Sequence, residues 1–298
     1  MYNFFNREYC VAVCRTDEIN CDLSNKEFKI IKNGVKYWAA DPFPIEIDGV
    51  LYIFAELFEY SKVKGAIGYT KWTDKGFTEW KKIIEEPYHL SFPNIFYRGD
   101  TLFMCPEAHE SGAVYLYRCV NFPDKWVKDQ ALFKSGEAVD TIFIEENNEI
   151  YGITCIWEGL KRHGLQIFKI EKERIEFSDA KLKLLPYYLS RPAGKVFYDQ
   201  SVNKKFVVSQ VCKPIYGAGL VFKEYLIKWP LYSEKEYRRI LPGDIKCNSK
   251  RRYNGIHTFN VTEHYIVIDL AWSRINIYEK VCRAVKKLKT IARNKKEG

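Results

Sequence analysis

The sequence predicts an all-β fold, a five-bladed β-propeller followed by a short basic helix at the C-terminus. The first observation is a sequence repeat. An apolar strand, a polar turn and a second strand follow one another in this order five times along the chain. The copies begin near residues 41, 92, 140, 191 and 257, and a spacing of roughly fifty residues is typical of propeller blades. The second is a composition of 47% hydrophobic and 16% aromatic residues, which supplies a large core. Because the repeats must share that core, we expect one domain over residues 1–277.

Each copy of the repeat predicts a β-hairpin. The first three copies align without a gap, so that Asp41, Phe92 and Asp140 correspond to one another. Residue pairs suited to tight turns separate the two strands of these copies: Asp48-Gly49, Gly99-Asp100 and Asn147-Asn148. The repeat therefore predicts a hairpin at the channel side of every blade.

Further strands complete the blades. Third strands are expected over residues 66–72, 113–119, 165–170 and 219–225, and outer strands over 80–84, 128–133 and 181–185. The fifth copy leaves little sequence for an outer strand. We therefore expect the N-terminal segment, residues 9–14 or 28–32, to complete the fifth blade and close the ring, which removes exposed strand edges.

After residue 277 the pattern changes from period two to helical, and residues 278–298 predict a basic amphipathic helix. Between residues 274 and 298, nine Lys and Arg and two Glu give a charge of 9 − 2 = +7, which leaves 9 − 7 = +2 for the rest of the chain. The propeller therefore lacks the positive charge of a nucleic-acid-binding protein. The helix is typical of one that binds an anionic membrane surface, and docking against the propeller is an equally open interpretation.

The cysteines and residues 1–14 predict the cellular compartment of the protein. The chain has nine Cys, an odd number without a CxxC pair, and most lie in apolar strands where a reduced thiol behaves as a small hydrophobe. Residues 1–14 contain no apolar run typical of a signal peptide, and no segment is apolar enough to span a membrane. We expect a cytoplasmic protein, peripheral at the inner membrane face if the helix binds lipid.

Propeller geometry brings the openings of the blades to one end of the central channel. The first strand of a blade lines the channel, and the second returns antiparallel to the same end. The opening residues form an inner ring of Asp41, Phe92, Asp140, Arg191 and His257. The ends of the second strands form a neighbouring ring of Glu56, Glu107, Cys155, Gln210 and Leu270. The expected flanking residues are Trp38, Phe43, His109 and Tyr216.

These side chains predict a sugar site. Clustered carboxylates shift one another's pKa values, which yields an acid and a base at neutral pH. The planar fork of Arg191 suits a phosphate or a sugar hydroxyl, and aromatic side chains suit the apolar face of a sugar ring. An Asp before Pro or Thr can alternatively do no more than end a strand. We predict catalytic roles for Asp41, Asp140 and Glu107. We predict substrate binding by Glu56, Trp38, His109, Arg191, Gln210, Tyr216 and His257. No metal site is predicted, although a divalent ion touching His257 in the channel is left open.

Several of these segments resemble a known family. They are Ala40-Asp41-Pro42-Phe43, Cys105-Pro106-Glu107, Phe122-Pro123-Asp124-Lys125-Trp126, Ser190-Arg191-Pro192-Ala193-Gly194, Tyr216-Gly217-Ala218-Gly219 and Gly255-Ile256-His257-Thr258. From about Trp38 to Asp269 the chain resembles the five-bladed N-terminal domain of plant glucosamine inositolphosphorylceramide transferases and its stand-alone bacterial relatives. That domain is in turn similar in fold to family 43 glycoside hydrolases, which invert configuration at the sugar carbon.

The similarity to family 43 implies roles for part of the inner ring. An Asp that opens one blade is the general base there, and Asp41 matches it. A second Asp, two blades on, orients the base and tunes pKa values, and Asp140 matches it. The family's general acid, a Glu on the following blade, has no match, because Arg191 opens the fourth blade. Glu107 is the best substitute and Glu56 follows, since an inverting hydrolase needs an acid opposite its base.

Three functions are consistent with the sequence. The favoured one is a glycosyltransferase in bacterial surface polysaccharide or glycolipid assembly at the cytoplasmic membrane face, using a nucleotide sugar as donor. An inverting glycoside hydrolase of the family 43 type is the second, and a non-catalytic glycan-binding or scaffolding propeller is the third. The expected partners are a sugar donor and acceptor, an anionic membrane surface through residues 278–298, and no nucleic acid.

Overall fold

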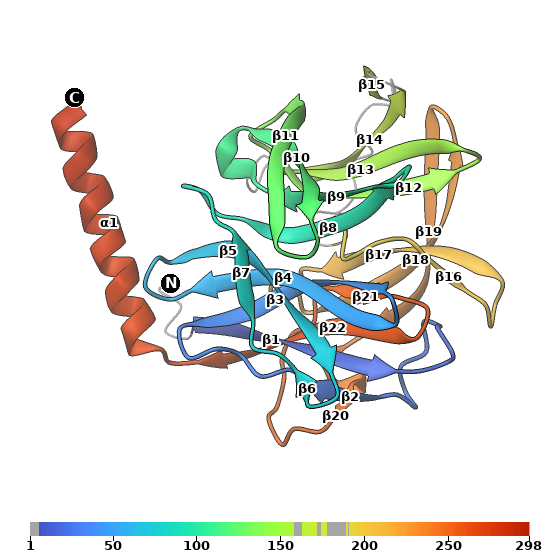
Figure 1. The fold of residues 1–298 in the computed structure, drawn as a ribbon, viewed down its shortest axis with the longest axis horizontal. Coiled ribbons are helices and arrows are strands. Elements are labelled where there is room, and N and C mark those ends of the chain that lie inside the picture. Colours follow the sequence, from blue (N-terminus) through green and yellow to red (C-terminus); the bar gives the residue numbers. More distant parts are fainter. Residues whose placement is uncertain (1–5, 158–162, 172–173, 178–188, 190, 298) are drawn as a thin grey trace.

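Five β-sheets make up the propeller in the computed structural model, which describes residues 6–157, 163–171, 174–177, 189 and 191–297 (Figure 1). Each sheet is one blade, and the chain ends in a helix at the side of the propeller. The predicted five-bladed all-β fold with a C-terminal helix is therefore confirmed.

The first two blades follow the repeat closely. The first contains β3 (Tyr37–Ile47), β4 (Val50–Glu59), β5 (Lys64–Thr73), β6 (Gly76–Phe77) and β7 (Lys81–Ile84). The second contains β8 (Ser91–Arg98), β9 (Thr101–Glu107), β10 (Ala113–Asn121) and β11 (Lys125–Lys134). In both, successive strands are antiparallel, and the outer strands cover the expected segments 80–84 and 128–133.

The third and fourth blades each have four strands. The third contains β12 (Ala138–Glu146), β13 (Glu149–Trp157), β14 (His163–Glu171) and β15 (Arg174–Phe177). The fourth contains β16 (Phe197–Asp199), β17 (Lys204–Val211), β18 (Gly219–Lys228) and β19 (Leu231–Ile240). The outer strand expected over 181–185 lies outside the described residues, and β15 pairs with β14 as an outer strand. Strand β19 was not anticipated from the sequence, because its alternating charged residues lack a strong apolar pattern.

The fifth blade combines both ends of the chain. It contains β21 (Phe259–Val261), β22 (Tyr265–Arg274), β1 (Asn6–Arg15), β2 (Glu27–Ile30) and β20 (Lys246–Cys247). Strand β1 is antiparallel to β22 along its whole length, from Asn6 opposite Arg274 to Arg15 opposite Tyr265. The chain thus closes the ring by strand pairing rather than leaving β22 with a free edge.

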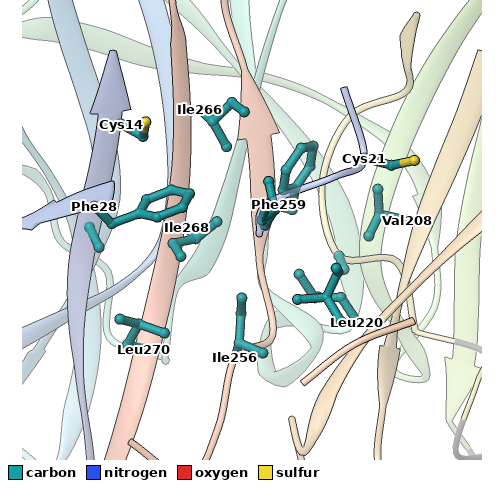
Figure 2. Close-up of a cluster of buried hydrophobic side chains, with 14 of the residues drawn as sticks. Cys14, Cys21, Phe28, Val208, Leu220, Ile256, Phe259, Ile266, Ile268 and Leu270 are labelled. Atoms are coloured by element: carbon teal, nitrogen blue, oxygen red, sulfur yellow. The ribbon is translucent and has the colours of Figure 1, made fainter. Parts of the chain in front are cut away.

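A large hydrophobic cluster joins the fourth and fifth blades (Figure 2). Phe28 of β2, Phe259 of β21 and Ile268 of β22 are all 0% exposed. Leu220 of β18 packs in the same cluster from the fourth blade. Full burial of one such side chain contributes about 1.5–3 kcal/mol, so this cluster stabilises the junction where the ring closes.

Helical structure is confined to short segments and the C-terminus of the described chain. Two single-turn 3-10 helices cover His109–Ser111 and Pro242–Asp244. Helix α1 covers Ile277–Glu297, and the Asn276 side chain caps its start by accepting a hydrogen bond from the Glu279 backbone N–H at 3.0 Å. Among the described residues, no helix combines the length and the apolar character needed to cross a bilayer.

Candidate active site

The opening residues of three blades share an unusual backbone conformation. Asp41, Phe92 and Asp140 have φ angles of 51°, 45° and 53°, in the left-handed region that bulky residues rarely adopt. At each of them the inner strand has one extra residue relative to its neighbour, a β-bulge. Bulges re-aim side chains, and here they occur in register at one end of the channel. The aligned repeat therefore encodes a common local distortion beside the candidate site.

A pocket of about 320 Å³ opens at this end of the channel, and we call it the mouth pocket. It is lined by Tyr9, Trp38, Asp41, Glu56, Phe58, His89, Ser91, Glu107, His109, Gly136, Glu137, Val139, Arg191, Tyr216 and His257. Eight of the ten residues predicted for the site are among them. The other two, Asp140 and Gln210, lie behind Arg191 and support it. The structure thus brings the predicted residues together.

Asp41 is held by groups from two segments, β8 and the residues just before β21. Its Oδ1 accepts a hydrogen bond from Thr258 Oγ1 at 2.8 Å, and its Oδ2 accepts one from the Phe92 backbone N–H at 3.3 Å. The Nδ1 atom of His257 lies 3.5 Å from Oδ1. Burial raises the pKa of Asp41 to about 6, although the nearby His257 charge opposes this. An Asp with such a pKa is ionised at neutral pH and remains basic enough to accept a proton.

Asp269 on β22 organises the residues around Asp41. Its Oδ1 accepts backbone hydrogen bonds from His257 and Thr258 at 2.9 and 3.1 Å, and its Oδ2 accepts one from the Asp41 N–H at 3.1 Å. Its Oδ2 is also 2.5 Å from His257 Nδ1. Burial disfavours the charged forms of both Asp269 and His257. The attraction between the two charges is stronger than this effect, so the pKa of Asp269 is lowered and that of His257 is raised. The Asp269 and Asp41 carboxylates therefore favour the positively charged form of His257.

Asp41, His257 and Asp269 could also be considered as metal ligands. One ligand atom from each lies within 4.8 Å of the others. The carboxylate oxygens of Asp269 already accept hydrogen bonds from backbone N–H groups, and its Oδ2 lies 2.5 Å from His257 Nδ1. A metal ion would have to displace those contacts, so the donor set fits an ion-pair network better than a cation site.

Arg191 and Asp140 form a buried ion pair. Arg191 Nε donates to Asp140 Oδ2 at 2.6 Å, and Gln210 Nε2 donates to the same oxygen at 3.3 Å. Burial raises the pKa of Asp140, and the Arg191 charge offsets part of that effect. The guanidinium carbon of Arg191 lies 5.1 Å from the centre of the Tyr216 ring. The pair places a fixed positive group in the wall of the mouth pocket.

Glu56 has an unsatisfied carboxyl oxygen. Its side chain is buried, and its Oε1 has no hydrogen-bond partner among the described residues. His89 Nε2 lies 3.4 Å away, and His89 Nδ1 accepts a hydrogen bond from the Gly65 N–H at 2.9 Å. Burial lowers the pKa of His89, so a neutral ring with its proton on Nε2 fits this arrangement. Burial and the neighbouring carboxylates Asp41 and Glu107 raise the pKa of Glu56 well above its usual range. These surroundings therefore favour the protonated form of Glu56.

The pKa of Glu107, unlike that of Glu56, is lowered. His109 donates to Glu107 Oε1 from its backbone N–H at 2.9 Å, and its Nδ1 lies 2.6 Å from the same oxygen. Ser91 Oγ donates to Oε2 at 3.2 Å. Burial acts to raise the pKa of Glu107, but these contacts outweigh it and lower the pKa, while the pKa of His109 is raised. The pKa values of two carboxyl groups in one pocket are thus shifted in opposite directions.

Aromatic side chains form the remaining walls. The Trp38 ring stacks on Phe58 with centroids 4.7 Å apart, and Tyr9 stacks on His257 at 4.5 Å. The Trp38 indole Nε1 is buried without a hydrogen-bond partner in the described structure. Tyr216 is 38% exposed at the rim. These surfaces suit a ligand with an apolar face and hydroxyl groups.

Some of the ring and flanking residues expected at the channel end do not line the pocket. Phe92 and Phe43 are 0% exposed and pack edge-to-face at 4.8 Å, because their large apolar rings gain more from the core than from the channel. Cys155 and Leu270 are also buried in hydrophobic clusters. Reasoning from sequence missed Tyr9, Phe58, His89 and Ser91, and it missed Asp269 behind the pocket. A signal for Asp269 existed, because it is the one acid in the apolar run Ile266–Trp272.

Comparison with known proteins identifies a family model and relatives that match this chain. The family model described as "Glucosamine inositolphosphorylceramide transferase 1, N-terminal" matches residues 29–182, about half of the chain. The chain is 31% identical over 245 residues to glucosamine inositolphosphorylceramide transferase 1 of Arabidopsis thaliana, covering 75% of this chain and 30% of that protein. It is 26% identical over 220 residues to the protein of that name in Oryza sativa subsp. indica, covering 68% and 28%. The chain thus spans less than a third of the length of these relatives.

Solved structures with the same fold are carbohydrate enzymes. A thermostable family-43 glycoside hydrolase matches 81% of this chain and 90% of its own, with a TM-score of 0.57 and 11% identity. The catalytic domain of a GH62 α-L-arabinofuranosidase from Coprinopsis cinerea matches 74% and 76%, with a TM-score of 0.56 and 11% identity. Identities this low establish a shared fold and no more. From the family match and the relatives, this chain belongs to the family of the N-terminal domain of glucosamine inositolphosphorylceramide transferase 1.

Proposed function

We propose that this protein is a carbohydrate-active enzyme whose chemistry takes place in the mouth pocket, and that it transfers a glycosyl group in surface polysaccharide or glycolipid assembly at the cytoplasmic membrane face. The observation that carries the proposal is a pocket in which the three buried carboxyl groups of Asp41, Glu56 and Glu107 lie together, with pKa values shifted in different directions. Asp41 and Glu107 are available as bases, and Glu56 is available as an acid. Such a division of roles is the pattern of acid–base catalysis at a sugar carbon.

Asp41 is the proposed general base. It accepts the proton of an acceptor hydroxyl as that oxygen forms a bond to the sugar carbon, and Asp41 becomes neutral. Thr258 and the Phe92 N–H fix its two oxygens, so the carboxylate cannot rotate away from the acceptor. The positive form of His257 favours the ionised starting form of Asp41, whereas the neighbouring Asp269 carboxylate opposes it. Asp140 acts less directly, by positioning Arg191.

Glu56 is the proposed general acid, in place of Glu107. Its proton would pass to the leaving oxygen as the bond between that oxygen and the sugar carbon breaks. Glu107 is held ionised by His109, so it suits acceptance of hydrogen bonds from sugar hydroxyls better than proton donation. The donor's charged leaving group, a phosphate in a nucleotide sugar, would face the positive charges of Arg191 and His257.

Inverting hydrolysis is the second candidate, because Glu56 supplies the acid that the fourth blade lacks. In that reaction Asp41 would activate water instead of an acceptor hydroxyl. A non-catalytic glycan-binding propeller is the third. It is disfavoured by Glu56, since burying a carboxyl oxygen without a hydrogen bond costs stability that a pure binding module need not sacrifice.

One assay series separates the three candidates. Purified protein would be incubated with a panel of nucleotide sugars and lipid-linked or oligosaccharide acceptors, and separately with aryl glycosides in water. Transfer to an acceptor that requires the nucleotide sugar supports the proposal, whereas release of the aryl group without a donor supports hydrolysis.

The matched variants are Asp41→Asn and Asp48→Asn, which make the same change at the same φ of 51°, in the pocket and in an exposed hairpin turn. Asp41→Asn should lower turnover by at least about 100-fold, and Asp48→Asn should leave it unchanged. Sugar binding that persists in Asp41→Asn, without turnover by the native protein on any substrate, would reject both enzymatic candidates.

A further inference from the structure

Helix α1 presents an apolar face to solvent. Ile277, Val281, Leu288 and Ile291 recur at helical spacing and are 72%, 54%, 66% and 45% exposed. Ala284 lies on the same face and is also exposed. A surface helix normally buries such a stripe against the core, so this arrangement is inverted. The apolar face is available to a partner outside the described chain.

The polar face of the same helix contacts the propeller. Glu279 is 1% exposed, and Arg283 Nε donates to its Oε1 at 2.8 Å. The Arg283 guanidinium carbon lies 5.5 Å from the centre of the Phe58 ring. Lys286 Nζ donates to the Val63 carbonyl oxygen at 3.2 Å. These three residues are spaced i, i+4 and i+7, so one polar stripe faces the propeller and fixes which side of the helix faces outward.

The start of the helix is also anchored. Asn276, which caps it, donates from Nδ2 to Glu8 Oε1 at 3.0 Å, and Tyr60 donates to the same oxygen at 3.1 Å. Glu8 is 1% exposed. The cap thus ties α1 to strand β1 and to the end of β4. The outward orientation of the apolar face is therefore determined by buried polar contacts at the first turns of the helix.

We propose that α1 docks the protein on an anionic lipid surface through this apolar face, with the mouth pocket held beside the membrane. Helical geometry places Lys280 and Lys287 along one border of the apolar face and Lys289 along the other. Lysines that border an apolar stripe can reach lipid phosphates while the stripe enters the headgroup region. Between residues 277 and 292 the one acid is Glu279, which is buried and bonded to Arg283.

The charge pattern argues against a second copy of the chain as the occupant. Two α1 helices packed face to face would bring their bordering lysines together, with no exposed acid in residues 277–292 to pair with them. An anionic bilayer meets both the apolar stripe and the positive borders.

The contact between α1 and the propeller lies next to the mouth pocket, so docking of α1 on a membrane would bring the pocket near the lipid surface. Phe58, which lies under Arg283, also lines the mouth pocket. A bilayer at the outer face of α1 is therefore adjacent to the end of the channel where the candidate site opens. The docking does not depend on the proposed sugar chemistry, and it can be tested without any substrate.

The test is co-sedimentation of the full chain with vesicles. We expect binding to vesicles with about 30 mol % phosphatidylglycerol, at least tenfold weaker binding to pure phosphatidylcholine, and release at high salt. Leu288→Asp should reduce binding at least tenfold, because it puts a charge in the apolar face. Thr290→Asp makes the same change of charge at an exposed residue that continues the polar stripe, opposite the apolar face, and should reduce binding no more than about threefold.

Three outcomes would overturn the proposal. They are absence of binding to anionic vesicles by the native chain, equal losses in the Leu288→Asp and Thr290→Asp variants, and a dimer in light scattering that Leu288→Asp dissolves. Circular dichroism and thermal unfolding of both variants check that α1 and the propeller remain folded, and a variant that lost either would be replaced by Val281→Asp.

Discussion

At the residue scale, the candidate site depends on how burial and neighbouring charges divide the carboxyl groups. Asp41, Glu56 and Glu107 are all buried in the same pocket, yet their pKa values move differently. Glu107 gains three hydrogen-bond contacts that favour its ionised form, whereas Glu56 Oε1 gains none. Local donors, and not burial alone, therefore assign the acid and base roles.

The first prediction concerns the pH dependence of turnover. The proposed base works only when ionised, and the pKa of Asp41 is about 6, so kcat/KM should fall as the pH decreases through about 6. The decline at high pH should follow the raised pKa of Glu56, because the proposed acid must be protonated. A pH–rate profile of the native protein measures both limbs. A rate that stays constant down to pH 4 would show that Asp41 is not the base.

The second prediction concerns stability. The folded state binds a proton to Glu56 more tightly than the unfolded state does, so the free energy of unfolding should fall as pH rises above about 4.5 toward the raised pKa. Glu56→Gln removes this loss and should raise the stability at pH 8 by on the order of 1 kcal/mol or more. Urea unfolding at pH 5 and pH 8 measures the difference. The exposed Glu145→Gln is the matched control, and an equal or negative effect of Glu56→Gln would contradict the assignment.

At the element scale, the repeated β-bulge shapes both the site and the core. A residue in the left-handed conformation opens each of three blades. It is Asp in two of the blades and Phe in the third. Asp41 and Asp140 sit at the end of the channel beside polar partners, whereas Phe92 packs on Phe43. The β-bulge sets the position of the opening residue. The polarity of its side chain then decides whether that residue lies in the site or in the core.

The third prediction tests that division. Phe92→Ala should lower the free energy of unfolding by about 3–5 kcal/mol, because it leaves a cavity beneath the pocket. Tyr97→Ala on the same strand, at a residue 53% exposed, should cost less than about 1 kcal/mol. Denaturant unfolding of the two variants provides the comparison. Similar costs would mean that Phe92 does not contribute to the core as its burial indicates.

Much of the fold and part of the site followed from the aligned repeat. Asp41, Glu56 and Glu107 could be found because equivalent positions in successive blades meet at one end of the channel. The repeat did not point to Asp269, because its register in the fifth blade corresponds to Ala55 in the first, where the repeat has no polar residue; only its place as the one acid in an apolar run singled it out. His89 comes from the segment between β7 and β8, outside the repeat. The direction in which α1 presents its stripe depends on Glu279, Arg283 and Lys286 contacting another part of the chain, which periodicity cannot specify.

At the scale of the whole molecule, the ring is closed by pairing of β1 with β22. This brings Tyr9 against His257 and Glu8 against the cap of α1, so closure also completes the mouth pocket and anchors the helix. The fourth prediction is that Ala12→Asp, which puts a charge into the core cluster of the fifth blade, lowers the free energy of unfolding by at least about 3 kcal/mol in a single cooperative transition. Arg15→Asp, at the exposed end of the same strand, should have a much smaller effect. Separate unfolding of the N-terminal strand, with the other blades unaffected, would contradict this role.

The central claim is that the mouth pocket between Asp41, Glu56, Glu107 and Arg191 binds a sugar, and crystals soaked with nucleotide sugars and simple glycans test it most directly. We predict a sugar ring in this pocket, against Trp38 or Tyr216, with hydroxyl or leaving-group oxygens within hydrogen-bond distance of Asp41 and Glu56. A ligand bound at another surface of the propeller, with only water between these carboxyl groups, would contradict the account.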